Sequence, residues 1–371
     1  MDKLLPSLQA FVASLLNLMP SRYQKQSLES ILGLLLEATG IASQKHCKGK
    51  APASISRFLN QYCWSTRSLI RSLRSWILEQ LISHVPKGRK PHLQVIIDLT
   101  TLEKKGKFKA FEQLIRVYHG KRGLHLVVLY LVMGNWRIPW SYRVYRGKGH
   151  PSPAELGRRL LKSLPKKMRK TFKIMVLADS AFGSVAFLTT IRRLKLYAIV
   201  GVPKTRKLVD GRSLAQLHKG GQHLYLKDLP FPVSIAHYYF TRDDGRKVKR
   251  YLISTRQLKP STIVWWGKRR WQIEGWFKTI KHRFSLHRFG QSTLLGVHRW
   301  LVLCLISFVL ALWGYWISGL SSQPDWGLAA QTALEFFFPT LVLSILLLDI
   351  EKKRSLANKH GIDIQISRWN I

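Results

Sequence analysis

The segment PHLQVIIDLTT, residues 91–101, decides the fold because it places one carboxylate directly after a β-branched apolar run. Val95, Ile96 and Ile97 predict a buried strand, and Asp98 follows them. A lone ionised carboxylate is costly to bury in such a place. We therefore expect a cation beside Asp98, either a basic side chain or a metal ion.

The composition indicates which kind of partner to expect. Among 371 residues, 61 are Lys or Arg and 19 are Asp or Glu, which gives a formal net charge of +42. The basic residues are spread from end to end and interleaved with aromatic residues, so the sequence favours nucleic acid over an anionic membrane as partner. With 46% hydrophobic residues the chain has the composition of a folded protein, which excludes intrinsic disorder.

Location and membrane association follow from two further patterns. The three cysteines lack paired or metal-type spacing and the N-terminus lacks a signal-peptide pattern, so we expect a cytoplasmic protein. Leu301–Leu320 is uncharged and long enough to span a bilayer, whereas the apolar block Phe336–Leu348 is too short. Basic residues lie on both sides of the long segment, so no charge asymmetry orients a span. A helix buried on all sides explains the same pattern, and we expect no membrane association.

The N-terminal region, residues 1–88, predicts a helical DNA-binding domain. Apolar residues recur at helical spacing in Leu28–Thr39 and Leu69–His84, with a shorter helix at Ser54–Tyr62 between them. Two helices joined near Cys63 are typical of a helix-turn-helix, but an ordinary helical bundle has the same pattern. Both interpretations stay open.

Residues 89–203 predict the first part of an α/β core. The expected elements, in order, are strands Leu93–Leu99, Leu114–Tyr118 and Leu124–Met133, helix Ala154–Leu164, strand Ile174–Ala178, helix Val185–Leu194 and strand Tyr197–Val202. This order indicates a mixed sheet, antiparallel in its first half and parallel in its second. Asp98 and Asp179 each follow an apolar strand, and ligands of open α/β sheets bind at such strand ends.

The remaining sequence divides into three regions. Residues 204–260 contain strand patterns and predict a β-rich insertion, residues 261–320 predict the second part of the core, and residues 321–371 predict a C-terminal helical segment. A helix expected from about Trp265 to Arg283 carries Arg270, Glu274, Lys278 and Lys281 on one face. Glu274 at this spacing is also compatible with a simple intrahelical salt-bridge ladder.

Asp98, Asp179 and Glu274 together indicate metal chemistry. Carboxylate oxygens suit Mg²⁺ or Mn²⁺, and two such ions can activate a hydroxyl nucleophile and stabilise the leaving oxygen of a phosphodiester. Arg270, Lys278 and Lys281 are suited to DNA phosphates. No segment has the spacing of a phosphate-binding loop, so we expect no nucleotide cofactor.

Three segments carry a resemblance to a known family. IIDLTT at 96–101, LADSAFG at 177–183 and RWQIEGWFKTIK at 270–281 resemble the signature blocks of bacterial insertion-sequence DDE transposases. The third is similar to the Tyr-x2-Arg-x3-Glu-x6-Lys signature of the branch with a β-stranded insertion, through Arg270, Glu274 and Lys281. Gly267 stands where that signature has tyrosine.

The resemblance implies an RNase H-like fold with Asp98 on its first strand, Asp179 after its fourth and Glu274 on a later helix. It implies two divalent metal ions held by these carboxylates, strand cleavage at element ends, and transfer of the freed 3′-hydroxyl into target DNA. It also implies a homodimer on paired ends, in a bacterial, nucleoid-associated setting. The alternative is a DNA-binding protein of the same fold whose catalytic core is decayed or repurposed.

Overall fold

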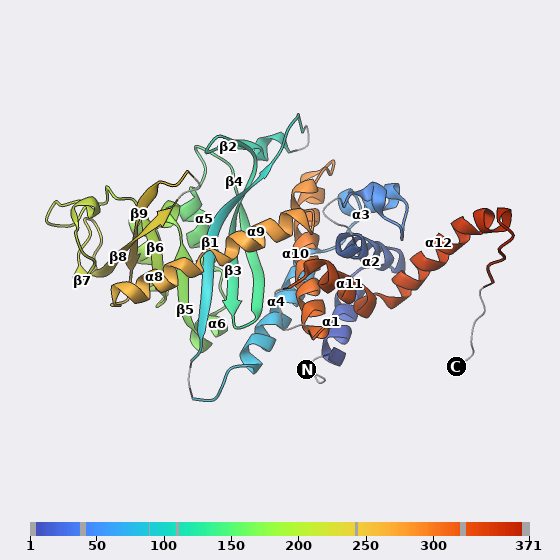
Figure 1. Ribbon diagram of the computed structural model, residues 1–371, viewed down its shortest axis with the longest axis horizontal. Coiled ribbons are helices and arrows are strands. Elements are labelled where there is room, and N and C mark those ends of the chain that lie inside the picture. Colours follow the sequence, from blue (N-terminus) through green and yellow to red (C-terminus); the bar gives the residue numbers. More distant parts are fainter. Residues whose placement is uncertain are drawn as a thin grey trace. The chain divides into compact units, whose positions relative to one another are not determined.

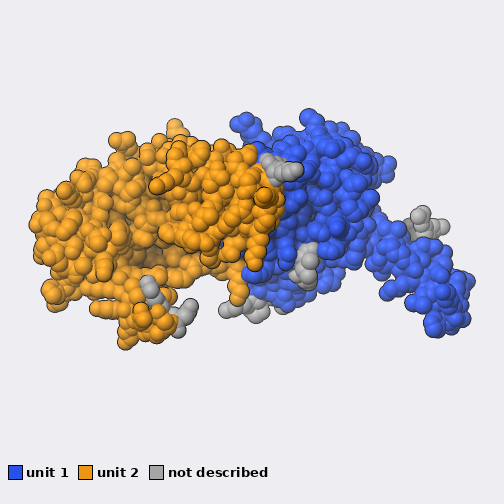
Figure 2. Space-filling view, turned by 90° about the horizontal axis from the view of Figure 1, so that it is seen from above, with its two compact units in different colours: residues 1–73, 279–371 blue, residues 74–278 orange. Residues whose placement is uncertain are grey.

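The computed structural model describes residues 5–37, 42–88, 90–108, 111–241, 244–319 and 324–365. The chain forms two compact units (Figure 2). One unit contains residues 1–73 and 279–371, and the other contains residues 74–278.

A mixed sheet organises the unit of residues 74–278 (Figure 1). Among the described residues it has nine strands, in the order β2-β3-β1-β5-β6-β9-β8-β7, with β4 paired to β3. The pairs β1–β5 and β5–β6 are parallel, and the other pairs are antiparallel. The strands are β1 (His92–Glu103), β2 (Arg116–Tyr118), β3 (Lys121–Met133), β4 (Trp136–Tyr145), β5 (Lys173–Ala178), β6 (Tyr197–Val202), β7 (Gly221–Leu224), β8 (Val233–Thr241) and β9 (Lys247–Ser254).

Helices flank this sheet, which confirms the predicted fold class. In Figure 1, α8 and α9 cross the front of the sheet, while α5 lies behind it. Apolar side chains of the parallel strands, such as Val95, Val176 and Val200, are fully buried between these layers. The helices are α5 (Pro153–Lys162), α6 (Lys166–Thr171), α7 (Val185–Arg193), α8 (Pro260–Arg269) and α9 (Gln272–His282), with single 3-10 turns η2 (Glu112–Leu114), η3 (Ser180–Phe182) and η4 (Leu214–Gln216).

The structure differs from the predicted elements in several places, and α6 has no predicted counterpart. The expected strand Leu93–Leu99 continues to Glu103, because the segment that follows Asp98 stays paired with β3. Strand β4 was not predicted, so Asp179 follows the fifth strand in chain order and not the fourth. The expected helix from Trp265 to Arg283 is divided into α8 and α9.

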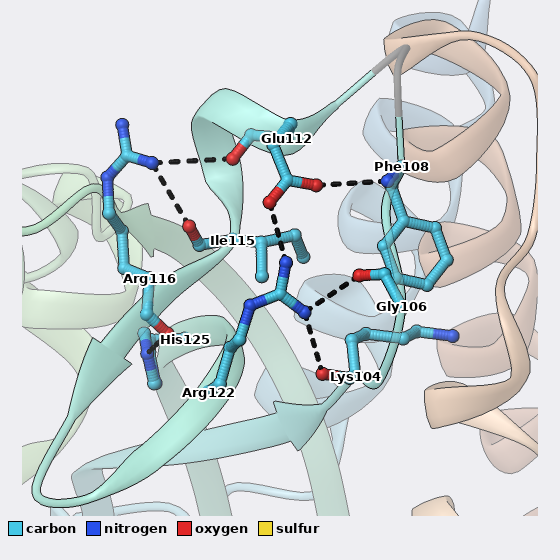
Figure 3. A network of polar contacts seen from close by, with 8 residues as sticks. All are labelled: Lys104, Gly106, Phe108, Glu112, Ile115, Arg116, Arg122 and His125. Carbon is cyan, nitrogen blue, oxygen red and sulfur yellow. Dashed lines mark hydrogen bonds and ion pairs between the residues drawn. The ribbon is translucent and has the colours of Figure 1, made fainter.

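A polar network around Arg122 on β3 contacts Lys104, Gly106 and Glu112, which lie between β1 and β2 (Figure 3). The guanidinium donates to the carbonyl oxygens of Lys104 at 3.0 Å and Gly106 at 2.9 Å. It also forms a 2.6 Å ion pair with Glu112, whose other oxygen accepts from the Phe108 amide at 2.9 Å. The network therefore ties the chain leaving β1 to the neighbouring strand.

The other unit is helical. Its elements are α1 (Leu5–Asn17), α2 (Arg22–Glu37), η1 (Gln44–His46), α3 (Pro52–Asn60), η5 (Leu286–Arg288), α10 (Leu294–Ile317), α11 (Trp326–Phe337) and α12 (Pro339–Lys359), and α4 (Thr66–Ser83) runs across the boundary between the units. Helix α10 covers most of the apolar segment 301–320, whose last residue lies outside the described ranges. It is long and apolar enough to cross a membrane, but 78% of its most apolar window is buried inside the structure. This burial favours the interpretation of α10 as a core helix.

Arg299 on α10 holds the connection between α3 and α4. Its side chain is 2% exposed and donates to the carbonyl oxygens of Phe58, Leu59, Tyr62 and Trp64 at 2.9–3.0 Å. The guanidinium also lies 4.1 Å from the Trp64 ring centre. Burial lowers the pKa of Arg299 to about 10, and the carbonyl oxygens satisfy most of its donors.

Candidate active site

Strand pairing places two aspartates side by side. The parallel register of β1 and β5 ends at the pair Ile97 and Ala178, so Asp98 and Asp179 are the next residues on two neighbouring strands. Backbones of paired strands lie about 5 Å apart, and residues level with one another point to the same face. Asp98 therefore lies within β1, at the point where the parallel pairing stops, and Asp179 caps η3 by accepting from the Ala181 amide at 3.0 Å.

Asp98 is deeply buried, with 7% of its surface exposed. One carboxylate oxygen accepts a 2.8 Å hydrogen bond from the Leu99 amide, and the other is ion-paired with the guanidinium of Arg270. The cation that the sequence requires beside Asp98 is therefore Arg270 in this structure.

Arg270 lies at the junction of α8 and α9. The backbone tightens there, because the amides of Ile273 and Glu274 bond to the carbonyl oxygens three residues earlier, at 3.2 and 3.0 Å. The guanidinium pairs with Asp98 through one nitrogen and with the Glu274 carboxylate at 2.8 Å through another. Arg270 thus bridges a sheet carboxylate and a helix carboxylate.

Helix α9 is anchored to the sheet by contacts on both sides of Glu274. Trp276 is 4% exposed and stacks on Tyr130 of β3 with ring centres 5.1 Å apart. Gln272 donates to the side chain of Gln94 on β1 at 3.1 Å. These contacts fix the helix turn that presents Glu274.

The carboxylates and Arg270 line one pocket of about 690 Å³. Its floor comes from the middle of β1 and the ends of β5 and β6, one wall from α8 and α9, and another wall from β8 and β9. The polar and aromatic lining residues are Asp98, Asp179, Ser180, Lys204, Tyr238, Lys249, Arg250, Tyr251, Arg270, Trp271, Glu274 and Phe277. Sequence reasoning singled out the floor and the helical wall, but it missed the contribution of β8 and β9.

Burial governs the electrostatics of this pocket. It raises the pKa of Asp98 to about 7, although Arg270 opposes the shift, and Asp179 and Glu274 add to it. Burial also raises the pKa of Asp179, against opposing effects of Arg270 and the Ala181 amide. Burial alone would lower the pKa of Arg270, but Asp98 and Glu274 outweigh it and raise that pKa. The Arg270 guanidinium therefore interacts with all three carboxylates of the pocket.

The helical wall also explains the glycine at the tyrosine position of the signature. Gly267 is buried on α8, and a Cβ atom added there would collide with a methyl group of Leu252 on β9. A tyrosine side chain has no room unless α8 moves away from β9. This wall therefore has no tyrosine side chain at the signature position.

Two further predicted residues lie on α9 beyond Glu274. Lys278 is exposed, and Lys281 lies in the last turn of the helix, beyond the boundary between the two units. Neither belongs to the lining of the pocket.

The donor set suits divalent metal ions by its chemistry, since all three groups are carboxylates and Asp98 lies level with Asp179, which follows the neighbouring strand. Within the described residues, however, no three His, Cys, Asp or Glu side chains are arranged around a point where one ion would fit. The reason is local, because the guanidinium of Arg270 lies between Asp98 and Glu274. Asp98 and Glu274 would be free to hold a metal ion if this side chain turned away.

Comparison with known proteins identifies a family. The family described as Transposase DDE domain matches residues 89–310, which is more than half of the chain and includes Asp98, Asp179 and Glu274. Among solved structures, the chain is similar to a piggyBac transposase in a cryo-EM structure of its synaptic complex with hairpin DNA. That match has a TM-score of 0.53 at 13% identity and covers 93% of this chain and 78% of the other, so it concerns the fold. No curated protein matches the sequence significantly.

Proposed function

Because the chain belongs to the DDE transposase family, we propose that it cleaves DNA strands at the ends of an insertion sequence and joins the freed 3′-hydroxyls to target DNA. The observation that carries this proposal is the convergence of Asp98, Asp179 and Glu274 on one pocket that also holds Arg270. We propose that this transposase acts as a homodimer on paired ends, in the bacterial cytoplasm at the nucleoid, without a nucleotide cofactor or a membrane anchor.

In the proposed mechanism, the three carboxylates hold two Mg²⁺ or Mn²⁺ ions. When bound, such ions lower the pKa of an attacking water or hydroxyl and stabilise the leaving oxygen of the scissile phosphodiester. Arg270 supplies positive charge to Asp98 and Glu274 in the free protein, and we propose that it turns to a phosphate when DNA enters. A guanidinium suits both tasks, because its planar fork binds a carboxylate or a phosphate through two parallel hydrogen bonds.

The basic residues outside the pocket hold the DNA backbone. Lys278 and Lys281 follow Glu274 on the same helix, and we propose that they bind phosphates that flank the scissile bond. The helical region of residues 1–88 is the proposed DNA-binding domain. Residues 89–203 and 261–320 are the proposed core, 204–260 the insertion and 321–371 the C-terminal helical segment. Strand β9 pairs with β6, so the strands of the insertion extend the sheet of the core.

A plasmid nicking assay tests the proposal. The substrate is a supercoiled plasmid that contains the gene with its flanking DNA, incubated with the protein and Mg²⁺. We expect the natural protein to nick the plasmid at the element ends, and Asp179→Asn and Glu274→Gln to lose nicking while still binding the same DNA. Glu155→Gln is the matched control, because Glu155 is a helix carboxylate paired with an arginine at 2.6 Å and lies outside the pocket.

Two outcomes contradict the proposal. If Asp179→Asn still nicks the plasmid, Asp179 is not required for cleavage, and the proposed catalytic role of the carboxylates is wrong. DNA binding by the natural protein without nicking in Mg²⁺ or Mn²⁺ would instead favour a repurposed DNA-binding protein of this fold.

A further inference from the structure

The strand wall of the pocket contains a guanidinium to which the proposed mechanism gives no task. Arg250 lies on β9, opposite Tyr238 of β8, and lines the same pocket as the carboxylates. It is half-buried, and its charge opposes the rise in the pKa of Asp179. Arg250 therefore lies close enough to the pocket floor to affect the ionisation of Asp179.

Aromatic rings hold this guanidinium in place. Its central carbon lies 4.3 Å from the ring centre of Phe240 and 5.6 Å from that of Trp271. These two rings stack on each other, with centres 5.7 Å apart and planes inclined by 17°. Phe240 belongs to β8, and Trp271 lies at the junction of α8 and α9. The support for Arg250 therefore comes from both walls of the pocket.

Arg250 differs from Arg270 in its charge partners. Within the described ranges, no Asp or Glu side chain lies within ion-pair distance of Arg250, in contrast to Arg270. Stacking on aromatic rings satisfies the flat face of a guanidinium but leaves the N–H groups along its edge available. A planar fork with available donors matches the two unesterified oxygens of a phosphodiester.

We propose that Arg250 binds a backbone phosphate of the DNA strand that enters the pocket along β9. The inference rests on the proposed function, because it assumes that the pocket accepts DNA. Arg250 holds this strand from β9, in addition to the groups that α9 presents to the same pocket. Phe240 and Trp271 act as positioning residues, because they fix the guanidinium before DNA arrives.

The experiment compares Arg250→Gln and Arg250→Lys with Lys247→Gln. Lys247 lies on the same strand, is exposed, and does not line the pocket, so this control removes one charge from β9 at another place. The probe is a DNA duplex that ends in the terminal sequence flanking the gene, with Ca²⁺ in place of Mg²⁺ to prevent cleavage. Binding is measured over a range of salt concentrations, first with natural DNA. It is then repeated with duplexes that carry one neutral methylphosphonate linkage at successive positions.

We expect Arg250→Gln to weaken binding about tenfold. It should reduce the slope of log affinity against log salt by about 0.9, as the loss of one phosphate contact does. The natural protein should lose affinity when the contacted phosphate is made neutral, and Arg250→Gln should show no additional loss at that position. Lys247→Gln should lose as much affinity as the natural protein when that phosphate is made neutral. The affinity of Arg250→Lys for natural DNA should lie between the affinities of Arg250→Gln and the natural protein. Thermal unfolding of each variant shows whether its fold is intact.

The inference is overturned if Arg250→Gln keeps the affinity and the salt slope of the natural protein. It is also overturned if Arg250→Gln loses affinity at every methylphosphonate position at which the natural protein loses affinity. The inference is also overturned if Arg250→Gln melts at a lower temperature but responds to each methylphosphonate position as the natural protein does. Arg250 would then contribute to packing and not to phosphate binding. If Arg250→Gln does not fold, the same comparison with Arg250→Lys decides. These results are independent of the nicking assay, since an end duplex can be bound without being cleaved.

Discussion

Replacing Asp98 by asparagine should remove a pH-dependent loss of stability from the metal-free protein. Burial raises the pKa of Asp98 from 3.8 to about 7, so between these pH values the folded protein binds a proton that the unfolded chain has released. The free energy of unfolding must therefore fall as the pH rises through this window. The gap between the two pKa values corresponds to about 4 kcal/mol, because each unit represents about 1.4 kcal/mol. Asparagine keeps the shape of the side chain but cannot ionise.

The assay is urea unfolding of the full chain in EDTA at pH 5 and pH 8, followed by tryptophan fluorescence. We expect Asp98→Asn to gain stability relative to the natural protein between these pH values, by a large part of that 4 kcal/mol. Asp228→Asn is the control, because Asp228 is exposed and has a positive φ of 66° that asparagine tolerates. If the natural protein and Asp98→Asn show the same pH dependence, then burial does not dominate the ionisation of Asp98.

Four further predictions concern the site and its support. Mn²⁺ affinity, measured by electron paramagnetic resonance, should fall about tenfold per pH unit below pH 7, because Asp98 must lose its proton to bind the ion; a flat profile would exclude Asp98 as a ligand. Arg270→Gln should bind Mn²⁺ about tenfold more tightly than the natural protein without DNA, because it removes a cation that competes for Asp98 and Glu274; weaker binding would refute this competition. Arg299→Met should lower the free energy of unfolding in urea by at least about 3 kcal/mol, because it leaves four buried carbonyl oxygens without their donor. A decrease below about 1 kcal/mol would show that water replaces the guanidinium. Gly267→Ala should lower stability by about 1 kcal/mol, because Leu252 must shift, and a stabilised variant would show that α8 has room to spare.

The catalytic strands could be predicted because their chemistry is local. Val95, Ile96 and Ile97 are β-branched and apolar, and both they and the strand before Asp179 are buried on both faces, so each reads as a continuous apolar run. Parallel pairing then made it reasonable to expect Asp98 and Asp179 at the same level. The sequence could not show that β1 continues past Asp98, since Thr100–Leu102 are held in the strand by pairing with β3.

The elements that were missed depend on contacts between distant segments. Strand β4 contains Pro139 and a register shift beside it opposite Leu129 and Tyr130, and both features break the alternation by which a strand is recognised. The junction between α8 and α9 has an ordinary helical sequence, and the bridge from Arg270 to Asp98 spans 172 residues. The sequence around Arg250 gives only a weak indication of a binding role, because it shows no more than a basic residue beside Tyr251 in a strand pattern. The place of Arg250 in the pocket depends on the pairing of β9 with β6.

That pairing also limits how the pocket can open. Strand β9 is joined to β6 by antiparallel pairing from Ile199 to Val202, and β6 is joined to β5, which carries Asp179 at its end. The strand wall is therefore part of the same hydrogen-bonded sheet as the carboxylates and cannot swing away as a lid without breaking that ladder. If the pocket opens by moving a wall, the wall that moves must be the helical one, because α8 and α9 do not belong to this ladder. A mutation that loosens β6 from β9 should consequently disturb substrate alignment before it affects the chemistry of the carboxylates.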